Sequence, residues 1–297
     1  MAKYEWSEVF MSIEGEAKYS GHPTAYIRFT KCNFECRGFN NPDKVDTTSL
    51  EVMGFNPADY SDIYSIPLIT KGCDSIYSWD EKYSHMWYKG TEIELGAAVK
   101  EILPDNQWVM PSGKRVILSL TGGEPTLRAK FIPTLLNSPD FKDCKHVLIE
   151  TNCAVPLQWN FISDMNKWLC DDTSRKLTWS NSPKLSVSGE KWEEAVVPKI
   201  AAMQRMVTGR EGMNQVDQYF KFVCGSDDAD FDEVHKAMRM YYAGEIPVET
   251  EVYIMPTACT SQQQDSIAAA VAKQCIDRGY IYCHRIQNSV FGNGVGT

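Results

Sequence analysis

The stretch PTAYIRFTKCNFEC, residues 23–36, joins a strand pattern directly to two closely spaced cysteines. Every second residue from Ala25 to Phe29 is apolar, which is the period of a β-strand. Cys32 and Cys36 follow on the loop that leaves this strand. The segment therefore predicts a strand with two thiols at its carboxyl end.

A third cysteine, Cys73, stands 37 positions after Cys36 and opens the run CDSIYSWD. Three thiolates can hold a 4Fe–4S cluster and leave one iron open, so an iron–sulfur enzyme is the first hypothesis. A C-x3-C-x2-C spacing would place the last cysteine at position 39, where the chain has Phe39. Residues 37–72 are rich in turn-forming residues and show little periodicity. We interpret them as a surface insertion within the cluster loop, which costs little entropy if its ends stay together.

Other uses of the cysteines remain open. They could be buried thiols, or part of a zinc site, although a structural zinc site needs four ligands. His85 and Cys144 are distant candidates for the fourth ligand. The chain has ten cysteines scattered along its length, and this distribution favours reduced thiols over a disulfide framework.

Length, composition and charge narrow the class of protein. With 297 residues, of which 43% are hydrophobic, the chain can bury a large core, and we expect a single domain over residues 1–297. The formal net charge of -9 argues against sequence-independent binding of nucleic acid. We find no apolar run of membrane-spanning length and no signal-peptide pattern in MAKYEWSEVF, so we expect a cytoplasmic protein without a membrane partner.

Strand and helix patterns alternate along the rest of the chain. This alternation predicts an α/β fold with a mostly parallel sheet, and we see no internal repeat. Loops are expected near 171–175 and 207–215. Further strands are expected in RVILSL, HVLIE, KLTWSN, QYFKFV, EVYIMP and YIYCHRI, and helices over 91–103, with a capping box, 129–136, 158–169, 191–206, 231–242 and 261–278.

Polar motifs come directly after the expected strands. In a parallel barrel the carboxyl ends of the strands converge on one face, so these motifs would share one pocket. The alternative is that Gly, Pro and Asn only mark turns after strands. The motifs are KCNFEC, TGGEP, ETN, NSPK, Cys224–Gly225, MPTA and HRIQN.

Several of these segments together resemble the 7-carboxy-7-deazaguanine synthase family of radical S-adenosylmethionine (SAM) enzymes. The resemblance is carried by SIEGE, Arg28, KCNFEC, CDSIYSWD and TGGEPTL. It implies a partial (β/α) TIM-like barrel that converts 6-carboxy-5,6,7,8-tetrahydropterin to 7-carboxy-7-deazaguanine, as in queuosine-type biosynthesis. It also implies a 4Fe–4S cluster, SAM and Mg²⁺ as cofactors, and a reductase such as flavodoxin or ferredoxin as partner. The sequence does not decide whether the protein is a homodimer.

The resemblance also assigns roles to individual residues, though it assigns no catalytic residue. Physically, Gly122 and Gly123 let a ligand approach the backbone, and the Glu124 carboxylate suits an ammonium group. The chain departs from the family at Glu14, where glutamine is usual, at Ala17 for glycine, and at Ser75 for threonine, although serine keeps the hydroxyl. The implied ligands are Cys32, Cys36 and Cys73 for the cluster, Ser75 for Mg²⁺, Gly122, Gly123, Glu124, Glu150, Asn152 and Ser182 for SAM, and Glu14, Glu16 and Arg28 for the substrate.

Alternatives to these roles stay open. Arg28 could be an ordinary strand arginine, Ser75 could cap a turn, and His284 is as readily structural as catalytic. Lys184 and Lys221 are weaker candidates for cations near the site. A glycyl-radical-enzyme activase would share the cluster and the GGEP motif but would act on a protein. A non-enzymatic metal-binding module is the other alternative.

Overall fold

The computed structural model describes residues 3–292 and 294–297 and contains a nine-stranded sheet of order β3-β1-β2-β4-β5-β6-β7-β8-β9. Every neighbouring pair from β2 to β9 is parallel, whereas β1 is antiparallel to both of its neighbours. The prediction of a mostly parallel α/β sheet is therefore confirmed. The strands are β1 (Tyr4–Ile13), β2 (Pro23–Phe29), β3 (Tyr88–Gly90), β4 (Ile117–Gly122), β5 (His146–Thr151), β6 (Lys176–Asn181), β7 (Val216–Cys224), β8 (Val252–Pro256) and β9 (Ile281–Tyr282).

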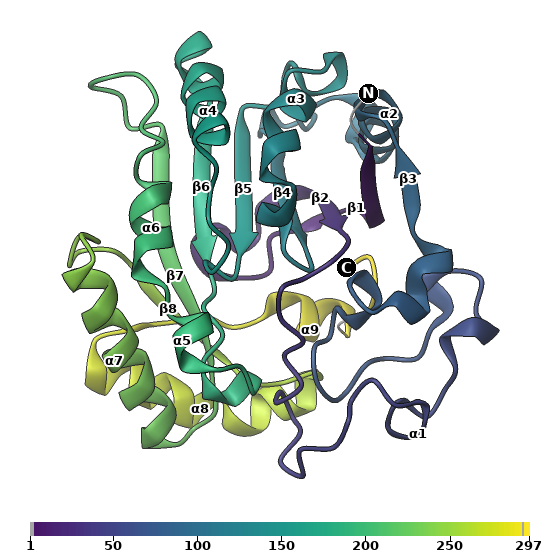
Figure 1. Ribbon diagram of the computed structural model, residues 1–297, viewed down its shortest axis with the longest axis vertical. Helices are drawn as coiled ribbons and strands as arrows, with labels where there is room; N and C mark the ends of the chain where they lie inside the picture. The colour runs from purple at the N-terminus through teal and green to yellow at the C-terminus, as the bar shows by residue number, and fades with distance from the viewer. Residues whose placement is uncertain (1–2, 293) are drawn as a thin grey trace.

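Helices α2 to α4 and α6 to α8 lie on the outside of the curved sheet (Figure 1). The capping box expected at Thr91 and Glu94 is present at the start of α2. No helix within residues 3–292 and 294–297 combines the length and apolar character needed to cross a membrane. The helices are α1 (Leu50–Met53), α2 (Glu92–Ile102), α3 (Ile132–Leu136), α4 (Trp159–Asp171), α5 (Trp192–Ala195), α6 (Pro198–Gln204), α7 (Asp228–Ala243), α8 (Ser261–Arg278) and α9 (Ile286–Phe291).

Three elements of the structure differ from the sequence-based expectation: the helix expected over 191–206, the strand β1 and the short strand β3. The single helix expected over 191–206 is wrong, because the chain leaves the helix at Val196 and Val197 and forms α5 and α6. Pro198 disfavours helical backbone at the residue before it, and Val197 has φ -124° and ψ 79°. The strand β1 was not expected at all, and it covers the side of β2 opposite to β4.

Side chains on the inner face of the parallel strands form an apolar layer that lies next to a polar site. Hydrophobic clusters fill the space between the sheet and its outer helices, with Leu120 and Trp179 in one and Phe222 and Ile254 in the other. On three of these strands, an apolar side chain on the inner face is followed two residues later by a polar side chain on the same face. The apolar and polar members of these pairs are Ile117 and Ser119 on β4, Leu148 and Glu150 on β5, and Tyr219 and Lys221 on β7.

The 37–72 segment packs against the body of the protein at the carboxyl ends of the strands, close to the C-terminus (Figure 1). Ile63, Ile66 and Ile69 are buried in a hydrophobic cluster with Tyr83 and neighbouring residues. The segment expected at the surface therefore has a small hydrophobic core of its own. The base of the segment is closed by a hydrogen bond of 2.7 Å from Gly72 N to Phe39 O.

Candidate active site

A cavity of about 400 Å³ lies at the carboxyl ends of the parallel strands. It brings together nearly all of the residues that the sequence assigned to cluster, cofactor and substrate. Glu124 is the exception, since its carboxylate is fully buried behind the cavity wall. The predicted residues that line the cavity are Glu14, Glu16, Arg28, Cys32, Cys36, Cys73, Ser75, Gly122, Gly123, Glu150, Asn152, Ser182, Lys184 and Lys221.

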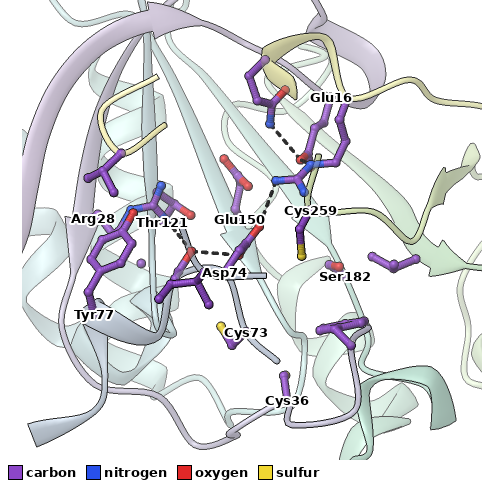
Figure 2. Close-up of a pocket in the computed structure, with 18 of the residues that line it drawn as sticks. Glu16, Arg28, Cys36, Cys73, Asp74, Tyr77, Thr121, Glu150, Ser182 and Cys259 are labelled. Atoms are coloured by element: carbon purple, nitrogen blue, oxygen red, sulfur yellow. Dashed lines mark hydrogen bonds and ion pairs between the residues drawn. The ribbon is translucent and has the colours of Figure 1, made fainter. Parts of the chain in front are cut away.

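The three cysteines separated by the 37–72 segment lie at one end of this cavity. Cys32 and Cys73 pack against the cluster of buried residues that contains Cys36. Figure 2 shows Cys36 and Cys73 together, across the cavity from Arg28, Glu150 and Glu16. The structure thus gathers three thiols that are far apart in the sequence.

Burial keeps these thiols protonated in the protein alone. It raises the pKa of Cys32 to about 12 and raises the pKa values of Cys36 and Cys73 as well. A negative charge on Cys73 would raise the pKa values of Cys32 and Cys36 further, because the three thiols are close in space. A positively charged iron group would offset both costs, because metal ligands bind as thiolates. The site therefore fits a cluster bound by three cysteines.

The zinc alternative finds little support. Within the described part of the chain, no group of three or more His, Cys, Asp and Glu side chains is arranged to hold a single metal ion. A four-iron cluster sets a different requirement, because its cysteines bind different iron atoms and so stand further apart than the ligands of one ion.

The cysteine loop is held by a carboxylate that sequence analysis missed. Glu190 accepts hydrogen bonds from the backbone N–H of Cys36 at 2.6 Å and of Glu35 at 2.9 Å. Cys36 itself has φ 49°, in the left-handed region that few residues adopt. The Glu190 bonds therefore stabilise a backbone turn that aims the second thiol. Its position 154 residues away left no sequence signal.

Gly122 and Gly123 are required for packing, which is a different reason from the one expected. A Cβ on Gly122 would lie 2.1 Å from Phe29 O, and one on Gly123 would lie 2.0 Å from Lys31 O. The two glycines let the end of β4 lie against the backbone that leads into the cysteine loop. They also line the cavity, so a ligand can still meet their backbone.

Glu124 is bound within the protein and does not reach the cavity. Its carboxylate accepts hydrogen bonds from Thr126 N and Oγ1, from Thr151 Oγ1 at 2.8 Å and from Asn152 N at 2.7 Å. Burial raises the pKa of Glu124. The geometry does not support direct contact between this carboxylate and an ammonium group. It gives Glu124 a positioning role, because it fixes the end of β5 beside Asn152.

Polar side chains continue from the end of β5 toward the cysteines. Asn152 Nδ2 donates to Asn33 Oδ1 at 2.7 Å, which ties β5 to the cysteine loop. Ser182, after β6, accepts a hydrogen bond from Lys184 Nζ at 3.3 Å. These groups form a polar wall between the thiols and the carboxylates deeper in the cavity.

The far side of the cavity holds a buried ionic network centred on Glu16. Lys221 Nζ contacts Glu16 and lies 3.6 Å from Glu150, while Arg285 Nε donates to Glu16 at 2.9 Å. Gln287 Nε2 also donates to Glu16, at 3.0 Å. Burial opposes ionisation of Glu16, but Lys221 and Arg285 outweigh it and lower its pKa to about 2. Glu16 is therefore a carboxylate at neutral pH.

Arg28 stands between a buried acid and the segment after Cys73. It pairs through Nε with Glu8, which is fully buried, and donates through Nη1 to Ser75 Oγ at 3.1 Å. Ser75 Oγ in turn donates to Asp74 Oδ1 at 3.2 Å, and Arg285 Nη2 donates to Asp74 Oδ2 at 3.0 Å. Figure 2 shows Arg28, Asp74 and Glu16 along this line of contacts. Arg28 is thus part of the site and is not an ordinary exposed strand arginine.

Sequence analysis missed Asp74 and Arg285 as members of the site, although it singled out both of their motifs. In CDSIYSWD it chose Ser75, and in HRIQN it considered His284. The structure places His284 in hydrogen bonds with Gln264, Tyr282 and Ser289, and His284 is not among the residues that line the cavity. A structural role for His284 is therefore favoured.

The 37–72 segment and the C-terminus complete the wall of the cavity. Tyr64, Ile66 and Leu68 line it from the segment, and Val295 and neighbouring residues line it from the C-terminus. Val295 also packs against the segment's hydrophobic cluster. A ligand in the cavity would therefore be shielded by two parts of the chain that lie outside the sheet.

Comparison with known proteins finds similarity in sequence and in fold. No family model matches the sequence. The chain is 27% identical over 300 residues to the 7-carboxy-7-deazaguanine synthase of Rhodopirellula baltica. The alignment covers 98% of this chain and 88% of that protein. Over nearly its whole length the chain is similar to a 7-carboxy-7-deazaguanine synthase. The family resemblance inferred from the sequence is thereby confirmed.

Two further matches cover a short stretch of the sequence and the fold, respectively. The 7-carboxy-7-deazaguanine synthase of Methanopyrus kandleri is 46% identical over 35 residues, which are 12% of this chain and 14% of that protein. The crystal structure of QueE from Escherichia coli superposes with a TM-score of 0.51 and 14% identity, over 96% of this chain and 94% of that one. At this identity the superposition supports the fold alone, and it confirms the expected fold class.

Proposed function

We propose that this protein is a radical SAM lyase that converts 6-carboxy-5,6,7,8-tetrahydropterin to 7-carboxy-7-deazaguanine. One observation carries the proposal: a single cavity joins three clustered cysteine thiols to carboxylate and arginine side chains suited to a carboxylated pterin. Similarity to a 7-carboxy-7-deazaguanine synthase over 98% of the chain supports the same reaction.

Cys32, Cys36 and Cys73 would hold the 4Fe–4S cluster, and the insertion reading of residues 37–72 is part of this proposal. When bound, the cluster and SAM supply the radical that takes hydrogen from the substrate ring. The backbone of Gly122 and Gly123 and the side chains of Asn152 and Ser182 would lie along SAM, because they line the wall next to the thiols. Glu124 would act through Asn152, whose backbone it holds.

The opposite wall would bind and orient the pterin. Arg28 is held by Glu8 from behind, so its planar guanidinium group is oriented to pair with the substrate carboxylate. Glu16 is a carboxylate that can accept hydrogen bonds from the 2-amino edge of the ring. Tyr64, Ile66 and Leu68 of the 37–72 segment would limit the access of water to the reacting atoms. Glu150 also lines the cavity, and it would contact SAM as the family resemblance implies.

Mg²⁺, an external reductant and a cytoplasmic location belong to the same proposal. Mg²⁺ prefers oxygen ligands and often takes only one or two from protein, the rest coming from water and substrate. Ser75 offers its hydroxyl at the cavity wall beside Asp74, and it makes no capping hydrogen bond to the helical turn that follows. A flavodoxin or ferredoxin would reduce the cluster. A homodimer remains a prediction that the mass of the protein in solution would test.

The reaction itself is the test of the proposed function. The anaerobically reconstituted protein is incubated with SAM, reductant and the carboxy-tetrahydropterin, and the products are analysed by mass spectrometry. We expect a ring-contracted product that has lost ammonia, formed only when all three components are present. If SAM is cleaved at the same rate with and without the pterin, and the pterin is recovered unchanged, the proposal is wrong and the activase alternative gains support.

A further inference from the structure

Glu14 differs from the other carboxylates of the cavity in its partners. Among the described acidic side chains that line the cavity, Glu16, Asp74 and Glu150 form ion pairs, but none is found for Glu14. Glu14 is only 3% exposed. Its Oε1 accepts a hydrogen bond from Glu16 N at 3.2 Å, and its Oε2 accepts one from the hydroxyl of Tyr26 at 3.2 Å.

The charges around Glu14 disfavour a second carboxylate anion beside Glu16. The nearby ammonium group of Lys221 is already in contact with Glu16 and lies 3.6 Å from Glu150. Glu16 and Glu150 are themselves negative neighbours of Glu14. A buried carboxylate without a cation of its own is costly, and two carboxylates that share a site favour protonation of one of them.

We propose that Glu14 is carried as a neutral carboxylic acid, and that its O–H group donates a hydrogen bond to a ring carbonyl of the bound heterocycle, while Glu16 beside it stays ionised. The cavity then offers adjacent donor and acceptor groups on one short segment. This pair matches a ring edge on which a carbonyl stands near an amino group. The role of the ligand in this inference rests on the proposed function, whereas the protonation state does not.

The electrostatic surroundings agree with this geometry. Burial raises the pKa of Glu14 well above its ordinary value, and Glu150 and Glu16 raise it further; Lys221 and the hydrogen bond from Tyr26 lower it, but by less. Tyr26 stays protonated, since burial and the nearby carboxylates raise its pKa. The titratable groups that face Glu14 are Glu16 on its own segment, Tyr26 on β2, Glu150 on β5, Tyr219 and Lys221 on β7, and Cys283 after β9.

The protonated state of Glu14 and the ionised state of Glu16 can be distinguished by measurements without any ligand. Glu14→Gln and Glu16→Gln are matched variants, because glutamine has the shape of a protonated glutamate and carries no charge. We measure the urea midpoint of unfolding of the cluster-free proteins from pH 5 to pH 8. A carboxyl group whose pKa is raised in the folded state makes the protein less stable as the pH rises above the unfolded value. We therefore expect Glu14→Gln to gain stability relative to the parent as the pH rises, and Glu16→Gln to lose stability at neutral pH.

Infrared spectroscopy of the same proteins gives a second readout. At neutral pH the parent should show a protonated carboxyl C=O band that is absent from Glu14→Gln. This difference also separates Glu14 from Glu124, whose pKa is raised too but which is unchanged in the variant. If the band is unchanged in Glu14→Gln, or if Glu14→Gln is destabilised as much as Glu16→Gln at pH 7, Glu14 is ionised and the inference is overturned.

Binding of the carboxy-tetrahydropterin then tests the donor role. We expect Glu14→Gln, which keeps a donor and an acceptor, to bind within about twofold of the parent, and Glu14→Ala to bind at least about tenfold more weakly, as the loss of a hydrogen bond predicts. Equal binding by Glu14→Ala would overturn the donor role. If the parent fails to bind the pterin while the unfolding and infrared results hold, the proposed function fails and the protonation of Glu14 stands.

Discussion

Replacement of Glu16 by glutamine tests the ionic network on which the substrate wall depends. The pKa of Glu16 falls from 4.5 to about 2 because Lys221 and Arg285 together outweigh burial. At about 1.4 kcal/mol for each tenfold change in the proton equilibrium, the carboxylate contributes about 3 kcal/mol to stability at pH 7. The cost of breaking a buried ion pair is about 3–5 kcal/mol, which is consistent with this value. We expect Glu16→Gln to lower the free energy of unfolding by about 3 kcal/mol at pH 7.

The pH dependence of this loss follows from the direction of the shift. A group whose folded pKa is depressed stabilises the protein above its unfolded pKa, and this contribution disappears as the pH falls toward the folded value. The difference between parent and Glu16→Gln should therefore stay constant from pH 8 to pH 6 and shrink by about 1 kcal/mol between pH 7 and pH 4. Urea unfolding of the cluster-free proteins, followed by circular dichroism, measures it.

Glu101→Gln is a suitable control for this experiment, since Glu101 is exposed on α2 and its replacement should change stability by less than about 0.5 kcal/mol. Our reasoning about the network is refuted if Glu16→Gln is as stable as Glu101→Gln at pH 7. It is also refuted if the difference from the parent grows as the pH falls.

Three further substitutions test other parts of the site. Glu124→Ala should keep the cluster but weaken SAM binding about tenfold, because Asn152 loses the partner of its backbone N–H; equal SAM affinity would remove the positioning role. Turnover should rise with added Mg²⁺ in metal-stripped buffer, and Ser75→Ala should lose most of this dependence while Ser75→Thr keeps it; a parent enzyme indifferent to Mg²⁺ would remove the metal from the account. Glu190→Ala should lose its cluster to a chelator several times faster than the parent, because two backbone N–H groups of the cysteine loop lose their acceptor; Glu193→Gln is the control, and equal rates would show that the loop holds its shape alone.

The sequence was sufficient to predict the parallel strands and the loops that meet at their carboxyl ends. It did not reveal β1, because a bulge between Trp6 and Glu8 interrupts the alternation that identifies a strand. Nor did it reveal the bond between Asp74 and Arg285, which joins residues 211 positions apart. Spacing along a chain identifies groups that share a local element, whereas such an ion pair depends on how the whole sheet curves.

Glu124 illustrates the other limit of sequence reasoning. Its place after two glycines at a strand end correctly predicted that it lies near the site. The direction of its carboxylate, toward Thr151 and Asn152 and away from the cavity, depends on which backbone N–H groups the neighbouring strand leaves without partners. The 37–72 segment shows the same limit, because its buried isoleucines pack against distant residues such as Tyr83, which local periodicity does not reveal.

The most direct test of the account is the identity of the cluster ligands. We expect single Cys→Ala changes at Cys32, Cys36 and Cys73 each to abolish the visible absorbance of the reconstituted cluster and the SAM-dependent change in its electron paramagnetic resonance signal. The same change at Cys144, Cys153, Cys170, Cys224, Cys259, Cys275 or Cys283 should leave both in place. Cys73 decides the matter, because it is the thiol that the 37–72 segment separates from the other two. A Cys73→Ala protein that keeps a full cluster and still cleaves SAM would contradict the account.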